Sequence, residues 1–213
     1  TSGFSMHPER VAEASSGEGL AWMQAQAKKK SCVVTGSMAV VEDGKYYNRL
    51  FWVEPNGHYH TYDKRHLFRM AKEDAHYSPG QHVLHTHLKN WTFRPLICYD
   101  LRFPFLYQTL RDKGAEIIIV PAAFTALTGE AHWQVLLRAR AIETQCFVIG
   151  AGQSGWHSQT RQTWGHSQII DPWGRVMAEQ QNEGEGVVFA VCDLVELNLI
   201  RQQMPILRHR RLF

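Results

Sequence analysis

Three side chains of the sequence have the chemistry that acyl transfer requires: the thiol of Cys98, the ammonium of Lys64 and the carboxylate of Glu73. A thiolate can attack an amide carbon, and a cation together with a backbone N–H can stabilise the oxyanion that forms. A carboxylate can move protons between the thiol, the leaving amine and water. Spacing along the chain does not show that the three side chains converge, so the elements that carry them decide the matter.

Cys98 lies at a predicted junction between a strand and a helix. The apolar run through Leu96 and Ile97 is typical of the end of a buried strand, and Pro104 suits a first helical turn. At such a junction, backbone N–H groups and the helix dipole favour a thiolate. A buried cysteine that only packs as a small hydrophobe is the alternative interpretation.

Lys64 is predicted at the end of a strand over residues 58–63, and Glu73 in the loop that follows. Residues 65–80 lack a clean period and form a long, charged and aromatic loop, a type that is often functional. Lysines at strand ends and carboxylates in loops are most often only solvated. Asp100 and Arg102 flank the cysteine, and we expect them to pair with one another or with the rest of the site, with a structural role favoured for Asp100.

The remaining pattern predicts about ten strands and four or five helices. We expect helices over residues 18–30, 104–113 and 130–145, and a last helix capped by Asp193 with Glu196. Ten strands with helices between them favour two sheets with helices outside, an α/β four-layer αββα sandwich. The expected strands cover residues 32–41, 46–53, 58–63, 82–88, 91–98, 115–121, 146–151 and 187–192.

Bulk properties indicate one globular domain over residues 1–213. The chain is 44% hydrophobic and 20% charged, which is ordinary for such proteins. A net charge of +3 is too weak to indicate nucleic-acid binding, and no apolar run reaches the length of a membrane span. We therefore expect no nucleic-acid partner, no membrane partner and a cytoplasmic location.

Cysteine and histidine spacing does not predict a metal site. The cysteines form no C-x-x-C pair, which favours reduced thiols in a reducing compartment. His58 with His60, and His85 with His87, have the alternate spacing of one strand face, but no further ligand lies near them in sequence. We expect exposed strand histidines and no metal or cofactor. The four cysteines are Cys32, Cys98, Cys146 and Cys192.

Several ordered motifs together resemble the nitrilase superfamily of carbon–nitrogen hydrolases, over essentially the whole chain. The resemblance implies a αββα sandwich, usually dimeric or larger, with a Glu-Lys-Cys catalytic set; we expect a homodimer. The motifs are Tyr62–Phe68, Glu73 before Ser78–Gly80, Ile97–Pro104, Gly129–Trp133 with Leu137–Glu143, and Gly165–Ser167 with Asp171–Gly174.

Matched position by position, the resemblance assigns roles to individual residues. Cys98 corresponds to the nucleophile, and Lys64 to the lysine that supports the tetrahedral intermediates. Glu73 corresponds to the family's second glutamate, which orders the site, and the Tyr99 N–H would complete the oxyanion hole. Arg102, or an arginine of the predicted helix over residues 130–145, would hold a substrate carboxylate.

One part of the family pattern is not found in the sequence. The general-base glutamate of the family precedes a segment that residues 1–6 resemble, so it would fall upstream of Thr1. We therefore expect a chain truncated at its amino terminus, lacking the first strand and helix of the fold. An internal strand that is missing leaves an exposed sheet edge, and such a piece is expected to be inactive and prone to aggregate.

The two halves of the sequence resemble two subfamilies with different substrates. The first half is similar to omega-amidases, which favours hydrolysis of a 2-oxoglutaramate-like α-keto acid amide with release of ammonia. The second half is similar to deaminated-glutathione amidases, which is the alternative. Two further readings are a non-catalytic binding subunit, favoured only by the absent glutamate, and a cysteine protease, which would need a histidine base that no motif supplies.

Overall fold

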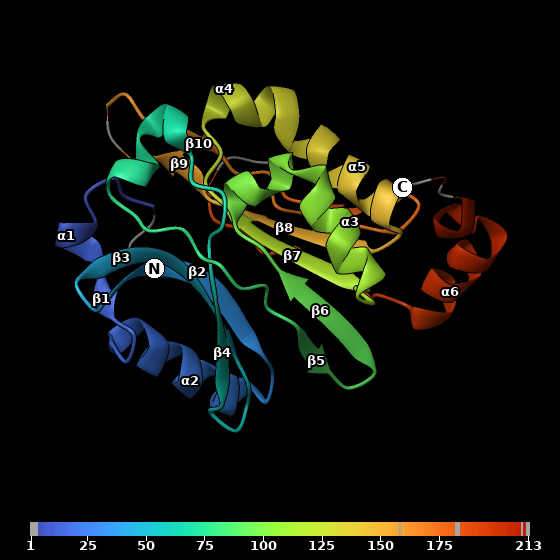
Figure 1. Cartoon of the computed structure of the whole chain (residues 1–213), viewed down its shortest axis with the longest axis horizontal. Coiled ribbons are helices and arrows are strands. Elements are labelled where there is room, and N and C mark those ends of the chain that lie inside the picture. Colours follow the sequence, from blue (N-terminus) through green and yellow to red (C-terminus); the bar gives the residue numbers. More distant parts are fainter. Residues whose placement is uncertain (1–3, 158, 182–183, 210, 212–213) are drawn as a thin grey trace. The chain divides into compact units, whose positions relative to one another are not determined.

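The computed structural model describes residues 4–157, 159–181, 184–209 and 211, so Thr1, Ser2 and Gly3 of the amino-terminal motif lie outside the described residues (Figure 1). The chain divides into two compact units, one of Thr1–Thr86 with Pro95–Asp100 and one of His87–Arg94 with Leu101–Phe213. The expectation of a single domain over residues 1–213 stays a prediction. Within the described part, no helix is long and apolar enough to cross a membrane.

The first unit is built on a four-stranded sheet in the order β1-β2-β3-β4. β1 runs parallel to β2, and the pairs β2–β3 and β3–β4 are antiparallel. Asp43 and Gly44 form the β2–β3 turn, both with positive φ, as the Asp-Gly signal predicts. The elements are α1 Pro8–Val11, β1 Glu13–Ala14, α2 Glu18–Lys30, β2 Val34–Glu42, β3 Lys45–Val53 and β4 Tyr59–Asp63.

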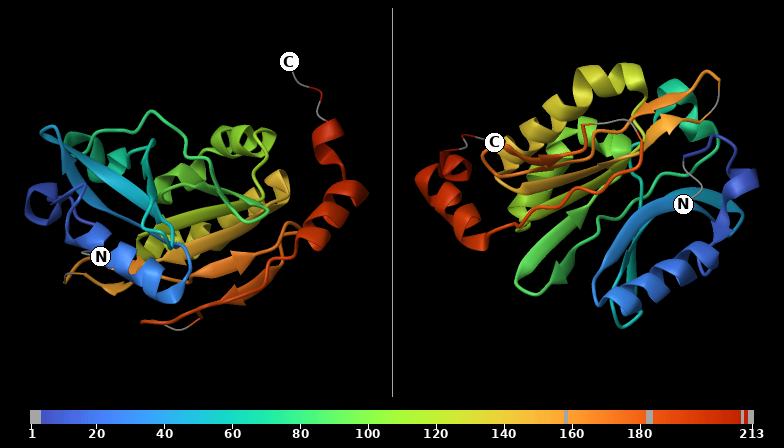
Figure 2. Two further views of the ribbon diagram at one scale, coloured as in Figure 1. Left: turned by 90° about the horizontal axis from the view of Figure 1, so that it is seen from below. Right: turned by 180° about the vertical axis from the view of Figure 1, so that it is seen from behind.

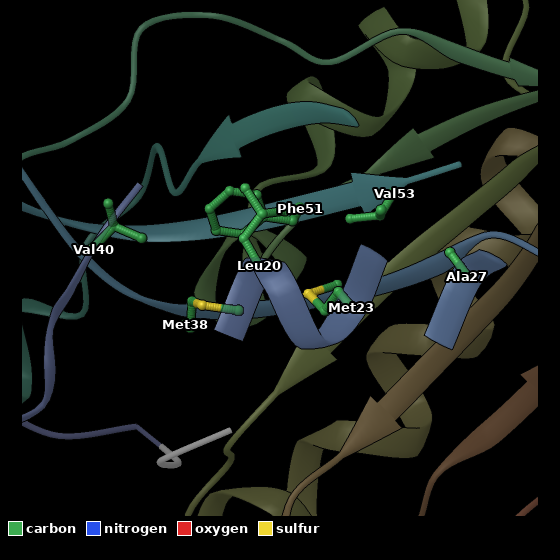
Figure 3. Packing of buried hydrophobic residues seen from close by; sticks show 7 residues of the cluster. All are labelled: Leu20, Met23, Ala27, Met38, Val40, Phe51 and Val53. Carbon is green, nitrogen blue, oxygen red and sulfur yellow. The ribbon is translucent and has the colours of Figure 1, made fainter. Parts of the chain in front are cut away.

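Helix α2 covers one face of this sheet. Its buried side chains recur at the three- and four-residue spacing of a helix face, and the strand residues that they contact alternate along β2 and β3 (Figure 3). The predicted helix over residues 18–30 is therefore confirmed. The cluster contains Leu20, Met23, Ala27, Met38, Val40, Phe51 and Val53.

The second unit is built on a six-stranded sheet in the order β12-β11-β8-β7-β6-β5, with a separate β9–β10 ribbon. β7 and β8 are parallel, and β7 is almost wholly buried, as the apolar run from Ile117 to Val120 predicts. Its strands are β5 Thr86–Leu88, β6 Trp91–Pro95, β7 Ile117–Ala122, β8 Phe147–Gly152, β9 Ser154–Trp156, β10 Gln162–Trp164, β11 Gln168–Ile170 and β12 Val176–Glu179.

Helices α3 Pro104–Asp112 and α5 Gln134–Thr144 pack against each other, and α5 also packs on β8 and β11 (Figure 2). The predicted helix over residues 130–145 begins earlier than expected, with α4 Ala126–Thr128 and a π-helical turn, Gly129–Trp133. A Cβ atom at Gly129 would lie 2.1 Å from the Cβ of Trp164, so only glycine fits against the β10 strand there.

The carboxyl-terminal part of the second unit differs from the prediction in one strand. Residues 187–192 form no described strand ladder, although Val187, Phe189 and Val191 alternate outward with 88%, 86% and 82% exposure. Alternation alone does not make a strand, because a strand also needs a paired neighbour. The last helix, α6 Leu194–Gln203, is capped as predicted by Asp193, which accepts from Val195 N at 2.7 Å.

The two strands before Cys98 are shorter than predicted. The expected strand over residues 82–88 is limited to β5, and the expected strand over residues 91–98 ends with β6 at Pro95. Proline has no N–H to donate to a ladder, which explains the end at this residue. The two residues that follow Pro95, Leu96 and Ile97, connect the strand to the turn that begins at Cys98.

Candidate active site

Lys64 and Glu73 form a buried ion pair in the first unit. The Lys64 Nζ lies 2.6 Å from Glu73 Oε2, and the two residues are 1% and 0% exposed. A lysine at a strand end and a carboxylate in a loop are usually solvated. Here both side chains are buried and pair with each other. Two full charges out of water require each other and further hydrogen bonds.

Strand β4 and the loop after it hold Lys64 by its backbone. Lys64 N donates to Asn48 O at 2.9 Å, which extends the β3–β4 ladder by one residue. Gly80 N donates to Lys64 O at 2.9 Å, so the end of the loop returns to the lysine. A Cβ at Gly80 would lie 2.1 Å from Asp63 O, which explains a glycine at this close approach.

Glu73 is held by short helical turns within the loop. The 3₁₀ turns Arg69–Ala71 and Glu73–Ala75 meet at Lys72, whose φ of 58° reverses the chain. The Glu73 carboxylate accepts from Phe68 N at 2.5 Å and from Asn48 Nδ2 at 3.4 Å, besides Lys64. Its oxygens thus accept from three donors: one on β3, one on Lys64 directly after β4, and one in its own loop.

Aromatic side chains border the Lys64 ammonium. The Nζ lies 5.4 Å from the centre of the Phe4 ring, and Phe4 stacks on Tyr77 at 6.0 Å. The Tyr77 hydroxyl donates to Ser5 O at 2.7 Å. Burial, and then the charge of Glu73, raises the pKa of Tyr77 above its ordinary value, so this phenol remains a neutral donor.

Cys98 occupies a strained turn, three residues after β6 ends at Pro95. Its φ is 44°, a left-handed conformation that non-glycine residues seldom adopt, and it begins the 3₁₀ turn Cys98–Arg102. The side chain is half-buried, and the ring of the following Tyr99 packs on Phe68 at 5.0 Å. The predicted junction is confirmed, since helix α3 begins at Pro104.

Asp100 links the turn of Cys98 to both sides of Lys64. Its buried carboxylate accepts from Ile97 N at 3.0 Å and from the Tyr62 hydroxyl at 2.7 Å. It also accepts from His66 N at 3.0 Å and contacts His66 Nδ1 at 2.7 Å. Tyr62 and His66 are each two residues from Lys64, so one carboxylate brings the thiol's turn and the lysine's segment together.

The arginines considered for a substrate carboxylate lie in the second unit. Arg102 Nη2 lies 3.2 Å from His132 Nδ1, and its guanidinium lies 5.2 Å from the centre of the Phe124 ring. The helix arginines are engaged elsewhere. Arg138 Nε donates to Gly174 O at 2.8 Å, and Arg140 Nε donates to Leu101 O at 2.9 Å. Their contacts hold helix α5 in place.

The other cysteines have different surroundings from Cys98. Cys146 is buried and donates to Ala115 O at 3.1 Å, and burial raises the pKa of its thiol. Burial, and then Glu196, raises the pKa of Cys192 to about 11. Cys32 is exposed. Both raised pKa values favour the thiol over the thiolate, which suits cysteines that only pack.

Sequence reasoning missed Asn48, Tyr62 and His66 as parts of the site. A signal for Asn48 was present, because a hairpin around residues 55–57 that pairs Arg49 with Asp63 also places residue 48 opposite residue 64. Tyr62 and His66 gave no such signal. Their contacts with Asp100 come from tertiary packing of segments 34 and 38 residues apart.

The arrangement has relatives among known proteins. The profile of the carbon–nitrogen hydrolase family matches residues 2–202. The chain belongs to this family. The nitrilase-like α/β fold that the motifs predict is thereby confirmed, and solved structures agree with it.

Curated relatives carry one repeated description. The chain is 46% identical over 158 residues to a deaminated glutathione amidase of Yersinia enterocolitica, covering 70% of this chain and 55% of that protein. It is 44% identical over 186 residues to a protein of the same description from Synechocystis, covering 79% of this chain and 65% of that protein. The matched part is thus less than two thirds of either relative.

Solved structures match over a larger share. A carbon–nitrogen hydrolase superfamily protein of Xanthomonas campestris, solved with an arsenic adduct in its active site, is 32% identical with a TM-score of 0.91. The match covers 99% of this chain and 81% of that one. Nit3 of Saccharomyces cerevisiae is 29% identical with a TM-score of 0.89, over 98% of this chain and 79% of that one.

Proposed function

We propose that this carbon–nitrogen hydrolase is an amidase that hydrolyses an amide of a small α-keto acid through a thioester on Cys98. The descriptions of the curated relatives favour deaminated glutathione as the substrate type over 2-oxoglutaramate. Deaminated-glutathione amidase, the alternative function in the sequence analysis, therefore becomes the first candidate, ahead of omega-amidase. The single observation that carries the proposal is the Asp100 carboxylate, which ties the strained turn of Cys98 to the segment of Lys64.

The proposed reaction has two acyl-transfer steps. The Cys98 thiolate attacks the amide carbon, the C–N bond breaks, and the nitrogen leaves as an amine after it receives a proton. Water then attacks the thioester, the C–S bond breaks, and the acid and the thiol are released. In each step a negative charge develops on the carbonyl oxygen, and Lys64 with the Tyr99 N–H is assigned to stabilise it.

Glu73 is assigned to position Lys64 rather than to transfer protons. Its carboxylate already accepts from Phe68 N, Lys64 and Asn48, so a proton-transfer role would break contacts that hold the lysine. The Lys64 ammonium, in contrast, has three donors and contacts one acceptor among the described residues. A buried ammonium that uses one donor for an acceptor among the described residues suits the binding of a developing oxyanion.

Arg102 is assigned to the carboxylate of the substrate. Its guanidinium lies over an aromatic ring and beside His132, and a guanidinium is the side-chain group whose shape best matches a carboxylate. Replacing Arg102 by Lys or Met is expected to raise KM more than it lowers kcat. The helix arginines Arg138 and Arg140 are not assigned this role, because their donors hold backbone carbonyls.

The test is release of amine from deaminated glutathione and ammonia from 2-oxoglutaramate, measured with protein expressed from its full reading frame. We expect kcat/KM to be at least about tenfold higher for deaminated glutathione, since one altered group in a pocket is worth about one to three kcal/mol. A higher kcat/KM for 2-oxoglutaramate would instead support the omega-amidase function. Substrate binding without turnover would favour the non-catalytic reading.

Cys98→Ala is the decisive variant. Loss of a covalent nucleophile typically lowers kcat by about 10⁴-fold or more, and the acyl adduct seen by intact mass after a single turnover should vanish with it. Cys32→Ala is the matched control, because it removes an exposed thiol of the same unit. Activity that survives Cys98→Ala would overturn the mechanism.

A further inference from the structure

The turn between β3 and β4 gathers three side chains that bind transition metals. We propose that Glu54, His58 and His60 form a binding site for a divalent ion of the zinc class. One ligand atom of each residue lies within 4.8 Å of those of the other two. The sequence alone predicted exposed strand histidines without a third ligand. Glu54, four residues before His58, is brought to them by the turn at residues 55–57.

The distances fit a site that needs little rearrangement. His60 Nε2 lies 3.6 Å from Glu54 Oε1, and the two imidazole rings lie 4.7 Å apart with an edge-to-face arrangement. Ligand atoms around a tetrahedral zinc ion are roughly 3.3 Å apart, given bonds of about 2.0 Å. Small rotations about the side-chain bonds of His58 close the remaining gap.

The backbone of the turn is fixed before any ion binds. Glu54 N donates to His58 O at 2.8 Å, and Gly57 N donates to Glu54 O at 2.9 Å. The Asn56 side chain accepts from His58 N at 2.9 Å. Gln24 of helix α2 donates to Gly57 O at 2.9 Å, which anchors the turn to the helix. The three ligands therefore start from one preorganised loop, which lowers the entropy cost of binding.

Strand register explains why these side chains share one face. The hydrogen bond between Glu54 and His58 makes them opposite neighbours, and His60 is two residues further on the same face of β4. An ion pair between His60 and Glu54 is the simpler explanation of two of the groups. It leaves His58, an exposed imidazole whose ring lies against His60, without a function.

The ligand set indicates which ions fit. Two imidazoles with one carboxylate and open positions suit Zn²⁺, Cu²⁺, Ni²⁺ or Co²⁺, whereas Ca²⁺ and Mg²⁺ prefer an all-oxygen shell. The site is separate from the candidate active site, although both lie along β4. His60 precedes Lys64 by four residues, which is about 13 Å along a strand.

The test is isothermal titration of the full chain with Zn²⁺, in a Cys98→Ala background so that the candidate nucleophile contributes no thiolate ligand. We expect one equivalent to bind, and His58→Ala or His60→Ala to weaken it by at least about tenfold, because each removes a ligand. Co²⁺ bound there should show visible d–d bands without the charge-transfer band that a thiolate gives.

His87→Ala is the matched control, since His87 is an exposed strand histidine that contacts Thr92. Its binding curve should match that of the Cys98→Ala parent, and circular dichroism should show each variant folded. Unchanged binding in the His58→Ala, His60→Ala double variant would overturn the proposal. So would the absence of any binding by the Cys98→Ala parent at 100-fold excess over protein of both Zn²⁺ and Co²⁺.

Discussion

Two buried cations occupy adjacent places on the β3–β4 pair, and their surroundings differ. Arg49 pairs with Asp63 across the strands, and Lys64 follows Asp63 directly. The Arg49 side chain is 8% exposed and the Lys64 side chain 2%. Burial and location are thus nearly the same for the two charges.

The difference lies in how many donors are in use. Arg49 Nε donates to Asp63, Nη1 donates to Ser15 and Glu42, and Nη2 donates to Glu42 and Asp63. These bonds use all five guanidinium hydrogens. The hydrogen bonds that Arg49 donates to Asp63 raise the pKa of Arg49 further, against the opposing effect of burial. Such a cation has no donor left for a ligand.

The Lys64 ammonium contacts Glu73 and, among the described residues, no second hydrogen-bond acceptor. The number of donors in use therefore distinguishes Arg49 from Lys64, whereas burial and sequence position do not. The comparison predicts that Lys64 matters to the reaction and Arg49 to the folded state.

The largest expected effect is that of Lys64→Met. This variant should lower kcat/KM more than about a thousandfold, because a preorganised oxyanion donor is worth several kcal/mol in the transition state. Steady-state assay of the folded fraction measures it. Wild-type-like kcat/KM in the variant would remove Lys64 from the mechanism and erase the contrast with Arg49.

Arg49→Met tests the other side of the comparison. It should lower the free energy of unfolding by about 2–4 kcal/mol, somewhat below the penalty for a fully buried pair because Glu42 is partly exposed. Urea unfolding followed by fluorescence measures the change. The activity per folded molecule should stay within about twofold, and a selective loss of activity would show that this cluster also serves the reaction.

Asp100→Asn sharpens the comparison. The Asp100 carboxylate belongs to the candidate site, and both of its oxygens are hydrogen-bonded. We expect both effects at intermediate size: about 1–3 kcal/mol of stability, and a lower kcat with little change in KM. Glu116, whose carboxylate accepts from Thr92 N at 2.8 Å, offers a hydrogen-bonded carboxylate outside the site as the control. A Glu116→Gln variant should lose stability without the drop in kcat.

The smallest effect concerns the thiols. The pKa of Cys192 is about 11, raised by burial, so about one molecule in a thousand carries the thiolate at pH 8. Alkylation by iodoacetamide at pH 8 should leave Cys192 largely unmodified while exposed Cys32 reacts, as peptide mass analysis can show. Its rate should rise about tenfold per pH unit up to pH 10. Equal rates for both cysteines at pH 8 would contradict the burial argument.

Local sequence patterns predicted the helices and turns whose formation depends on neighbouring residues. The helix over residues 18–30 and the helix start at Pro104 follow from apolar spacing and proline geometry. The π turn at Gly129–Trp133 did not follow, because a 3.6-residue period does not reveal a bond to the fifth residue. The strand predicted at residues 187–192 had the right alternation but no described partner.

The candidate site divides in the same way. Motifs pointed to Cys98, Lys64 and Glu73, whose chemistry is visible in their residue types. The supporting contacts were not predictable, since the bonds from Tyr62 and His66 to Asp100 depend on how distant segments pack. The Glu54 carboxylate was missed for a related reason, because only the strand register brings it to His60.

At Cys98 the left-handed backbone favours glycine for stability, whereas the proposed reaction needs a thiol. In ordinary positions alanine is favoured over glycine by about 0.5–1 kcal/mol, because glycine loses more backbone freedom on folding. At φ of 44° the order reverses, so Cys98→Gly should be the more stable of the two thiol-free variants. Selection for stability alone would thus favour glycine here, and the proposed thioester on Cys98 is the function that a cysteine at this position would serve.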